Sequence, residues 1–555
     1  MNEKIDENFY DHWIDELVDN IIANWPKVDT FNCNCGISVS GKQHVGRLRG
    51  EIVLTSAVTQ ELKNKGFNAN HLLILYTSDP WKGKESQMSA FGDSKEGEQY
   101  VNRRLVDVPS PHDPNERWID YYWKEFGDPL PLFGKDVQIV YTHELYKEEK
   151  TKKFIKLIFS KKEPIREILN KYRGDNPLPE GWIPINALCE HCGQIGNTKS
   201  LEVDLDSYKV KYFCSNCKSE GWSSIEVGKL TWRLEWLAIW YLLNIHFEPY
   251  GKDHATPGGS RDSCIEILET VFSHKGPYGY WNEWVGYSEG RTDFGDMSSS
   301  SFIGFTPTTW NKYADPEVIK YLYLKNPPHR RIVLGLDKIP SYINEYDKAE
   351  RIYHGYEELA NESEMKKVRR SLELTYFNDV PDYRGFQLEY LHAAILTQLV
   401  QPSKEGVLSA IKKIEESFLG RKINVEENFE YINNRLKMAN QWIIDEGPSH
   451  LKIEILQEIT NELITNIPEV CHELIDDLHA NLNKDKWTEE SIKNGMIAVR
   501  DEHSLSRKQM KEFFNSLYLI FLGRSQGPRL APLLASLDKQ WVINRLDFIG
   551  KKNRN

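Results

Sequence analysis

The strongest constraint on the fold is an alternation of strand, loop, helix and strand near the start of the chain. Residues 30–36 are typical of a strand, and they run into a glycine- and serine-rich loop. Apolar side chains recur at helical spacing over residues 47–65, and Gly66 follows where a helix C-cap glycine belongs. The short apolar run 71–77 is typical of a buried parallel strand. This order predicts a βαβ unit, so we expect a parallel sheet with a ligand site at the carboxyl ends of its strands.

Two segments far apart in the chain have the residues of one nucleotide site. The first, Gly36–Arg47, joins the first strand to the helix and contains His44-Val-Gly46. Backbone N–H groups and the positive end of the helix dipole at such a helix start bind phosphate. The second, Asp296–Ser300, is a serine-rich run after a strand-like segment, and a loop of small residues can close over a triphosphate. The pair therefore predicts ATP-dependent, adenylate-forming chemistry.

The bulk composition is that of a globular protein with several domains. A chain of 555 residues is too long for one hydrophobic core, so about two to four domains are expected. No apolar run approaches the roughly 20 residues that span a bilayer, and the polar, acidic start Met1–Glu7 is not a signal peptide. We therefore expect a cytoplasmic protein with no membrane partner. The net charge of −12 argues against general binding to DNA or RNA, although local basic patches could bind one RNA.

Four of the eight cysteines form a metal-ligand pattern. Cys189-Glu-His-Cys192 is followed, after an alternating strand at residues 208–213, by Cys214-Ser-Asn-Cys217. Two Cys-x-x-Cys turns of this kind place four thiolates around one tetrahedral ion, which predicts a zinc ribbon. Four sulfur ligands leave no position for water, so the Zn²⁺ would be structural. Free thiols, two disulfides, or His191 in place of one cysteine are the weaker alternatives.

The pattern of elements divides the chain into four segments. Residues 1–85 contain the βαβ unit, and residues 86–228 have an irregular pattern that ends with the cysteine ribbon, which predicts an insertion. Residues 229–330 contain a tryptophan-rich helix over 230–243 and the serine run, and they are predicted to complete the sheet. Glycine becomes scarce after residue 330, so residues 331–555 are expected to form a helical domain.

Several motifs together resemble one family of enzymes. His44-Val-Gly46 and Met297–Ser300 resemble the HIGH and KMSKS signatures of class I aminoacyl-tRNA synthetases. Further runs are similar to class I lysyl-tRNA synthetases in particular, and the cysteine ribbon falls where that family has one. These runs are Gly36–Gly41, Trp232–Trp236, Phe247–His254, Gly258–Ser260 and Phe521–Leu530. The resemblance covers nearly the whole chain.

The resemblance implies a fold, a reaction and a set of partners. It implies an α/β fold with a doubly wound, Rossmann-type parallel sheet, a zinc-bearing insertion and an all-α C-terminal domain that binds tRNA. It implies that lysine is activated by ATP with Mg²⁺ to an aminoacyl-adenylate, with release of pyrophosphate. The aminoacyl group would then pass to the 2′-OH of the terminal adenosine of tRNA(Lys), so the expected activity is that of a lysine–tRNA ligase.

The resemblance also suggests roles for individual residues. His44 would donate to the phosphates of ATP, and Gly46 would let the nucleotide approach the backbone. Asp253 would bind the ribose hydroxyls or a substrate amine, and Glu235 or Asp253 would face a cationic side chain. The catalytic candidates are His44, Gly46, Arg47, Lys252, Asp253 and His254. The ATP-binding candidates are Ser38, Ser40, Gly41, His44, Gly46, Gly251, Asp253, His254, Met297, Ser298, Ser299 and Ser300. The amino-acid-binding candidates are Gly36, Ser38, Glu235, Trp236, Tyr250, Asp253 and Arg261.

Structural roles are the alternative for several of these residues. A lone histidine is often a surface or core residue, and Gly251-Lys-Asp-His254 could be a structural turn. Trp232, Trp236 and Trp240 recur at helical spacing, and such a stripe favours core packing for any one of them.

Both nucleotide segments depart from the family pattern. Arg47 stands where asparagine is usual, and Asp296 and Ser299 stand where KMSKS has lysines. Ser301 and Phe302 follow where lysine and glycine are common. An aspartate beside a triphosphate is repulsive unless Mg²⁺ lies between them or the loop turns it outward. The missing positive charge could come from one of four cations, which are Lys42, Arg47, Lys252 and Arg261.

Arg261 leaves the substrate and the acceptor open. It stands where an aromatic residue is expected, and a guanidinium in the pocket would repel lysine. Two alternatives follow: an adenylating paralogue that passes a different amino acid to a non-tRNA acceptor, and a catalytically weak tRNA-binding protein. The basic residues that could contact RNA are Lys161, Lys162, Arg166, Lys171 and Arg173; His329, Arg330 and Arg331; Lys366, Lys367, Arg369 and Arg370; and Arg524, Arg529, Arg545, Lys551 and Lys552.

Overall fold

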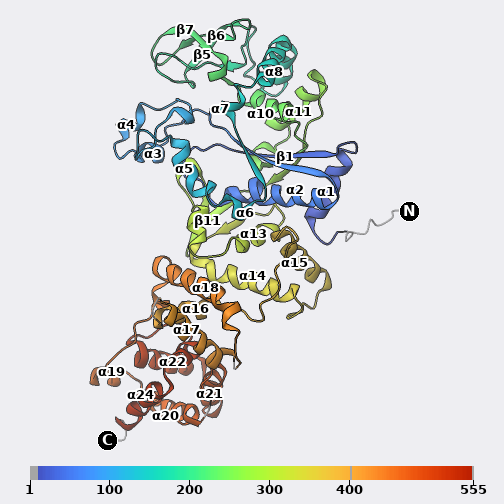
Figure 1. The fold of residues 1–555 in the computed structure, drawn as a ribbon. Coiled ribbons are helices and arrows are strands. Elements are labelled where there is room, and N and C mark those ends of the chain that lie inside the picture. The colour runs from blue at the N-terminus through green and yellow to red at the C-terminus, as the bar shows by residue number, and fades with distance from the viewer. Residues whose placement is uncertain (1–9, 401–402, 420, 485, 553–555) are drawn as a thin grey trace. The chain divides into compact units, whose positions relative to one another are not determined.

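The chain forms two compact units (Figure 1). The computed structural model describes residues 10–400, 403–419, 421–484 and 486–552. The first unit contains the residues up to 311 together with 315–335 and 348–381, and the second contains 312–314, 336–347 and those from 382 onward. Within the described residues, no helix combines the length and the apolar character needed to cross a bilayer.

A five-stranded parallel sheet is the centre of the first unit. Its strands lie in the order β10-β9-β1-β2-β3, and every neighbouring pair is parallel. The strands are β1 (Thr30–Ile37), β2 (Asn68–Leu75), β3 (Val137–Tyr141), β9 (Phe247–Gly251) and β10 (Tyr278–Asn282). The chain order runs outward from β1 on one side and from β9 on the other, so it reverses between these two strands. Their carboxyl ends therefore flank the crevice where such sheets bind ligands, and the predicted doubly wound sheet is confirmed.

Helices cover both faces of this sheet (Figure 1). On one face lie α1 (Trp13–Asn24), the π-helical segment η1 (Leu48–Leu54) and α2 (Thr55–Asn64); on the other lie α10 (Trp232–Leu242) and α11 (Ser260–Val271). The helix predicted over residues 47–65 is therefore η1 and α2 in succession. Gly66 follows α2 with a φ of +92°, as expected for a C-cap glycine.

Residues 86–228 contribute to the main sheet as well as to an insertion. β3 lies inside this segment and pairs with β2 from Val137 to Tyr141. The antiparallel ribbon that follows consists of β5 (Thr198–Asp204), β6 (Lys209–Cys214) and β7 (Glu220–Ser224), and a short pair joins β4 (Ile185–Asn186) to β8 (Lys229–Leu230). The helices here are α3 (Glu85–Ser89), α4 (Ser94–Glu98), α5 (Trp118–Gly127), α6 (Leu130–Phe133), α7 (Thr142–Leu145), α8 (Glu149–Ser160) and α9 (Lys162–Lys171).

A second, three-stranded sheet carries the serine run. Its central strand β11 (Val285–Glu289) pairs antiparallel with β12 (Thr292–Asp296) and parallel with β13 (Ile332–Leu334). The serine run follows β12 directly and forms the short 3-10 helix η5 (Ser299–Ser301). The helices α12 (Pro307–Asn311), α13 (Pro316–Leu324) and α15 (Glu362–Thr375) complete the described part of this unit after the serine run.

The second unit is helical in its described residues. The helical domain expected over residues 331–555 does not coincide with this unit, because β13 and residues 348–381 belong to the first unit. The helix α14 (Ile339–Tyr353) begins in this unit and ends in the first. A core of aliphatic and aromatic side chains is built mainly by the helices after residue 460, with Ile395 also buried in it. The helices from residue 382 onward are α16 (Tyr390–Leu399), α17 (Lys404–Lys413), η7 (Ile414–Leu419), α18 (Val425–Asp445), α19 (Asn461–Thr465), α20 (Glu469–Lys484), α21 (Glu489–Glu502), α22 (Arg507–Leu522), α23 (Leu530–Ser536) and α24 (Lys539–Lys552).

Candidate active site

A cavity of about 510 Å³ lies at the carboxyl ends of β1 and β9. The segment after β1, the residues after β9 and the serine run all reach it. The predicted site residues in its wall are Gly36, Ser38, Ser40, His44, Gly46, Arg47, Trp236, Tyr250, Gly251, Asp253, His254, Met297, Ser298, Ser299 and Ser300. The predicted site residues outside its wall are Gly41, Glu235, Lys252 and Arg261. The fold therefore brings the two predicted nucleotide segments to one cavity.

The segment Gly36–Arg47 and the serine run are in direct contact. Ser299 Oγ lies 3.4 Å from Gln43 Oε1. A Cβ at Gly41 would lie 2.5 Å from Ser299 O and 2.4 Å from a ring carbon of Phe302. Only glycine permits this approach of the two backbones, so Gly41 acts beside the cavity wall and not in it.

His44 lies in the cavity wall as a neutral imidazole. Burial, reinforced by the positive charge of Arg47, lowers the pKa of His44 to about 3. Its Nδ1 has no hydrogen-bond partner among the described residues. A Cβ at Gly46 would lie 2.8 Å from that atom, so the glycine makes room for the ring. A buried ring with an unpaired nitrogen can exchange a hydrogen bond with a ligand without carrying a charge.

The described wall of the cavity is strongly acidic. Its single Lys or Arg side chain is Arg47, and this residue is already paired with Glu51 at 2.9 Å. The carboxylates in the wall are Glu51, Asp79, Glu248, Asp253, Glu283 and Asp296. A triphosphate would be repelled by such a surface, so the donor set suits a nucleotide that arrives with Mg²⁺.

Glu248 is the buried acid of this wall, and sequence reasoning missed it. It lies on β9, is 5% exposed and accepts hydrogen bonds from Trp236 Nε1 at 2.9 Å, Asn34 Nδ2 at 3.0 Å and Trp240 Nε1. Burial raises the pKa of Glu248, and the three N–H donors oppose that rise. All three donors are neutral, and Arg261, whose charge also lowers the pKa of Glu248, forms no ion pair with it within the described residues, so this carboxylate can still accept a cationic partner from the cavity.

Glu235, a predicted amino-acid-binding residue, lies outside the cavity wall. It is 2% exposed, accepts from Tyr146 Oη at 3.0 Å and pairs with Lys229. Lys229 also pairs with Asp79 at 2.8 Å. On α10 the residues that reach the cavity are Trp232 and Trp236, one turn apart, and Glu235 projects from a different face of the helix. Its carboxylate is therefore part of a buried structural ion pair.

Arg261 and Lys252 also lie outside the cavity wall. The Arg261 guanidinium packs 4.9 Å from the centre of the Tyr250 ring and donates to Pro277 O. Lys252 pairs with Glu283 and lies 4.7 Å from the centre of the Trp284 ring. Neither side chain lines the cavity, but the charge of Arg261 still acts on Glu248 in its wall and lowers the pKa of that carboxyl.

The segment Gly251–His254, at the end of β9, forms one edge of the cavity. Lys252–His254 form the 3-10 helix η4, and His254 Nε2 lies 3.4 Å from Asp253 Oδ2. The His254 ring packs 5.0 Å from the Trp236 ring, and burial lowers its pKa. Trp240 is fully buried whereas Trp232 is 37% exposed. The tryptophan stripe is therefore divided between core and site.

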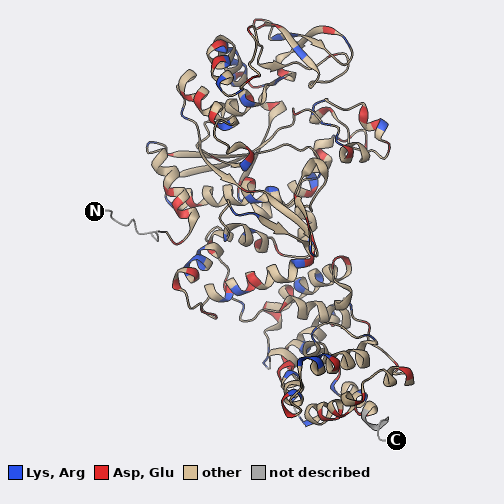
Figure 2. Ribbon diagram, turned by 180° about the vertical axis from the view of Figure 1, so that it is seen from behind, with Lys and Arg blue, Asp and Glu red and all other residues tan. Residues whose placement is uncertain are grey.

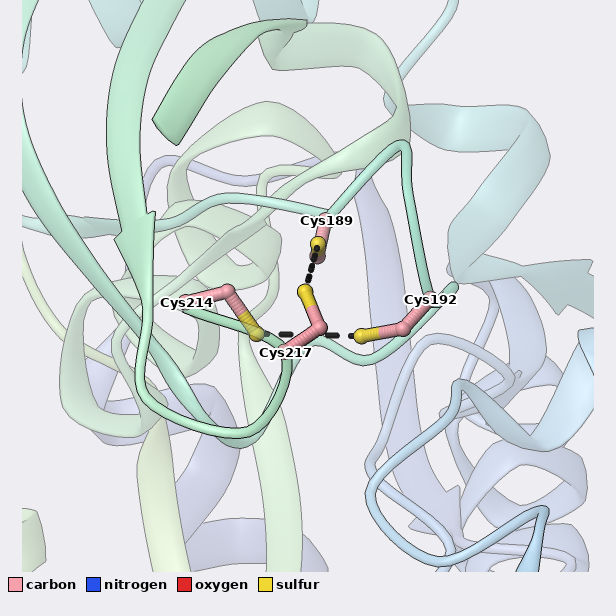
Figure 3. Close-up of side chains that lie close together, drawn as sticks. All are labelled: Cys189, Cys192, Cys214 and Cys217. Carbon is pink, nitrogen blue, oxygen red and sulfur yellow. Dashed lines mark hydrogen bonds between the residues drawn. The ribbon is translucent and has the colours of Figure 1, made fainter. Parts of the chain in front are cut away.

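The four cysteines of the ribbon converge on one point (Figure 3). Their sulfur atoms all lie within 4.8 Å of one another, and no disulfide joins them. The Sγ atoms of Cys189 and Cys217 are 3.6 Å apart, and those of Cys192 and Cys214 are 3.7 Å apart. Sulfurs around a tetrahedral Zn²⁺ are about 3.8 Å apart, because each Zn–S bond is about 2.3 Å long. The thiols present therefore fit a structural zinc ion.

Residues 11–377 match the family described as tRNA synthetases class I (K). The chain belongs to this family. The lysine–tRNA ligase of Aeropyrum pernix is 39% identical over 541 residues, which covers 96% of this chain and 97% of that protein. The lysine–tRNA ligase of Pyrococcus horikoshii is 30% identical over 548 residues, which covers 97% of this chain and all of that protein. The resemblance indicated by the motifs is confirmed.

Many basic residues of this class I (K) synthetase chain are bound within the protein. Arg370 pairs with Asp15 at 2.7 Å and with Glu61, and Arg545 donates to the carbonyl of Ile520. Figure 2 shows Lys and Arg interspersed with Asp and Glu along the helices of both units. The side chains of Lys551 and Lys552 lie outside the described residues. The predicted basic groups are therefore less available to RNA than the sequence suggested.

A groove of about 430 Å³ lies beside the cavity and shares Trp232 with it; we call it the Trp232 groove. Its walls come from the end of α9 and the loop that follows, and from the starts of α10 and α11. The lining residues are Leu169, Tyr172, Arg173, Asn176, Leu178, Trp182, Thr231, Trp232, Arg233 and Ser260. Neither arginine forms an ion pair with a carboxylate in the described part of the chain. Arg173 Nε donates to the carbonyl oxygen of Asn176 at 2.7 Å. Aromatic faces beside guanidiniums that no carboxylate neutralises are suited to single-stranded nucleotides.

Proposed function

We propose that this chain is a lysine–tRNA ligase. A carboxylate oxygen of lysine attacks the α-phosphorus of ATP, and pyrophosphate leaves. The 2′-OH of the terminal adenosine of tRNA then attacks the carbonyl carbon of the adenylate, and AMP leaves. The relatives named as lysine–tRNA ligases support this proposal over nearly the whole chain. We also propose that the enzyme acts in the cytoplasm.

The buried carboxylate of Glu248 is the observation that carries the choice of lysine. Its hydrogen bonds from Trp236, Trp240 and Asn34 fix its orientation at the cavity wall. This desolvated carboxylate receives hydrogen bonds only from neutral donors, so it keeps a negative charge with which the ε-ammonium group of lysine would form an ion pair. Asp253 remains the second candidate for a substrate amine or for the ribose hydroxyls.

The nucleotide would lie between His44 and the serine run. His44 would donate from its neutral ring to a phosphate oxygen, and the missing Cβ at Gly46 would let the phosphates approach the backbone. The amides of Ser298–Ser300 would contact the triphosphate from the other side. Bound Mg²⁺ would supply the positive charge that this acidic wall lacks, with Asp253 and Glu283 as the acids that could hold it.

The Trp232 groove would receive the unpaired end of tRNA. Trp182 and Trp232 offer stacking faces, and Arg173 and Arg233 offer positive charge to the sugar-phosphate backbone. The groove is next to the cavity, so a strand in it would have its terminal hydroxyl close to the adenylate. The helical second unit would bind the rest of the tRNA.

The four-cysteine cluster would hold Zn²⁺ with a structural role. Cys189, Cys192, Cys214 and Cys217 would be its ligands, and none of them lines the cavity. The ion would tie the two turns of the ribbon together and would take no part in the reaction.

Amino-acid-dependent exchange of ³²P-pyrophosphate into ATP tests the proposal. Exchange with lysine above the other standard amino acids, followed by acylation of tRNA(Lys), is the expected result. Exchange with another amino acid would instead favour the adenylating paralogue. Absence of exchange with every amino acid, with tRNA still bound in a gel-shift assay, would favour the tRNA-binding protein.

A further inference from the structure

Asp296 places a carboxylate at the start of the serine run, where the family pattern has a lysine. The side chain is 28% exposed and belongs to the cavity wall. A negative charge here opposes a triphosphate in the cavity. Within the described residues, none of the four cations that the sequence offered as substitutes forms an ion pair with Asp296. Arg47 is paired with Glu51 and Lys252 with Glu283.

Arg331 is the side chain that compensates Asp296. Its Nε donates to Asp296 Oδ1 at 3.1 Å. Its two terminal nitrogens donate to the carboxylate of Asp293, at 2.9 and 3.3 Å. One planar guanidinium therefore holds both aspartates of β12, a geometry that the fork of arginine allows and lysine does not.

The three-stranded sheet is shaped to bring Arg331 to Asp296. Arg331 directly precedes β13, and β11 lies between β13 and β12. Gly286 of β11 is the register partner of both Asp296 and Val333. A Cβ at Gly286 would lie 2.5 Å from a terminal nitrogen of Arg331, so glycine at this point lets the guanidinium cross the middle strand.

We propose that Arg331 is a positioning residue for ATP: it neutralises Asp296 at the cavity wall, so that the triphosphate can lie against the serine run. This inference rests on the proposed function for the identity of the nucleotide. The compensating positive charge in this chain lies outside the serine run, on the residue that directly precedes β13 of the three-stranded sheet. Arg331 acts through Asp296 and does not touch the nucleotide.

Equilibrium binding of Mg²⁺ and the non-hydrolysable analogue AMPPNP, measured by calorimetry, tests this directly. Arg331→Ala leaves Asp296 unpaired, so the Kd for AMPPNP should rise roughly tenfold or more. The additional change Asp296→Asn removes the repulsion and should return the Kd to within about threefold of wild type. Asp293→Asn in the same Arg331→Ala background is the matched control, because Asp293 does not line the cavity and should give no recovery.

Three results would overturn the inference. An unchanged Kd in Arg331→Ala would mean that Asp296 does not oppose the nucleotide. A double variant, Arg331→Ala with Asp296→Asn, that binds as weakly as the single variant would mean that Arg331 braces the strands or touches phosphate itself. Absence of AMPPNP binding by the wild-type protein would remove its premise. A failed lysine exchange with intact AMPPNP binding would instead overturn the choice of lysine and leave this test valid.

Discussion

Buried histidines make the first unit sensitive to acid. Burial lowers the pKa of His12, His71 and His246 to about 4, and that of His44 to about 3. The unfolded chain titrates these groups near pH 6.5, so between about pH 4 and 6.5 it binds protons that the folded state excludes. The free energy of unfolding should therefore fall as the pH drops through this window, by about 1.4 kcal/mol per pH unit for each such histidine.

Urea unfolding followed by tryptophan fluorescence between pH 7.5 and 5 measures this slope. His71→Gln removes one of the buried rings, which contacts Ser56 Oγ at 2.9 Å, and should make the slope shallower by about one proton. His112→Gln, at an exposed position, is the matched control. An identical slope in the His71 variant and the wild type would contradict the assignment.

Glu248 determines the second residue-scale prediction, which concerns the amino acid. Glu248→Gln removes the charge and retains the shape, so the KM for lysine in pyrophosphate exchange should rise by roughly 30-fold or more, with the KM for ATP nearly unchanged. Asp347→Asn is the control, because that carboxylate is also buried but pairs with Arg435 and does not line the cavity. It should lower the unfolding midpoint without changing the KM for lysine. Equal effects of both changes on the KM would contradict the role of Glu248.

The sequence places the functional residues on the correct segments but cannot orient them. Glu235 and Glu248 both lie in runs that resemble the family, and nothing local distinguishes them. Which acid faces the cavity depends on how α10 is rotated against β9, a tertiary property. The role of Arg331 could not be predicted for the same reason. It requires β13 to pair with β11, and it requires Gly286 to leave room for the guanidinium.

At the scale of elements, the contact between the loop after β1 and the serine run should control adenylate formation. Gly41→Ala introduces a Cβ 2.5 Å from the backbone carbonyl oxygen of Ser299. This clash cannot be relieved by a change of side-chain rotamer, because the contacted atom belongs to the backbone. The run should be displaced from the cavity, and kcat for pyrophosphate exchange should fall about tenfold or more. Thermal unfolding should change by only a few degrees. Wild-type exchange in this variant would mean that the run need not approach the loop during the reaction.

The zinc ribbon gives the second element-scale prediction. Cys214→Ser should lose stoichiometric zinc, measured by atomic emission, and should lower the unfolding temperature, because metal binding contributes to folding of such a site. Cys264→Ser is the matched control, since Cys264 is a buried thiol outside the cluster. It should keep its zinc. One zinc per chain in the Cys214 variant, with unaltered stability, would refute the ligand assignment.

Elements with a strong local signal were predictable, and those defined by distant pairing were not. β1, α2 and β2 follow from apolar periodicity and from Gly66, because each is buried by its own neighbours in sequence. β3 is short, only partly buried and set among irregular segments, so it is recognised only by its pairing with β2. Its place in the main sheet therefore had to come from the structure.

At the scale of the whole molecule, a chain of net charge −12 can bind tRNA only through local sites. Several predicted basic residues form ion pairs within the protein. In the Trp232 groove, Arg173 and Arg233 form no ion pair with a carboxylate within the described residues, and they lie in the same groove as the exposed Trp232 ring next to the cavity. Arg173→Glu reverses one of these charges. Arg173 lines the groove but not the cavity, whereas Trp232 lines both. The KM for tRNA in aminoacylation should rise several-fold, and its dependence on salt concentration should weaken, because one phosphate contact is lost.

Pyrophosphate exchange separates this effect from damage to the cavity, because exchange requires no tRNA. Arg173→Glu should therefore lower acylation far more than lysine-dependent exchange. Lys150→Glu, an exposed lysine on α8 outside the groove, is the matched charge control and should change the KM for tRNA much less. Equal loss of both activities in the Arg173 variant would mean that the groove supports the cavity rather than the tRNA. Because acylation adds tRNA binding and transfer to the step that exchange measures, a selective loss of acylation would assign the role of Arg173 to the tRNA.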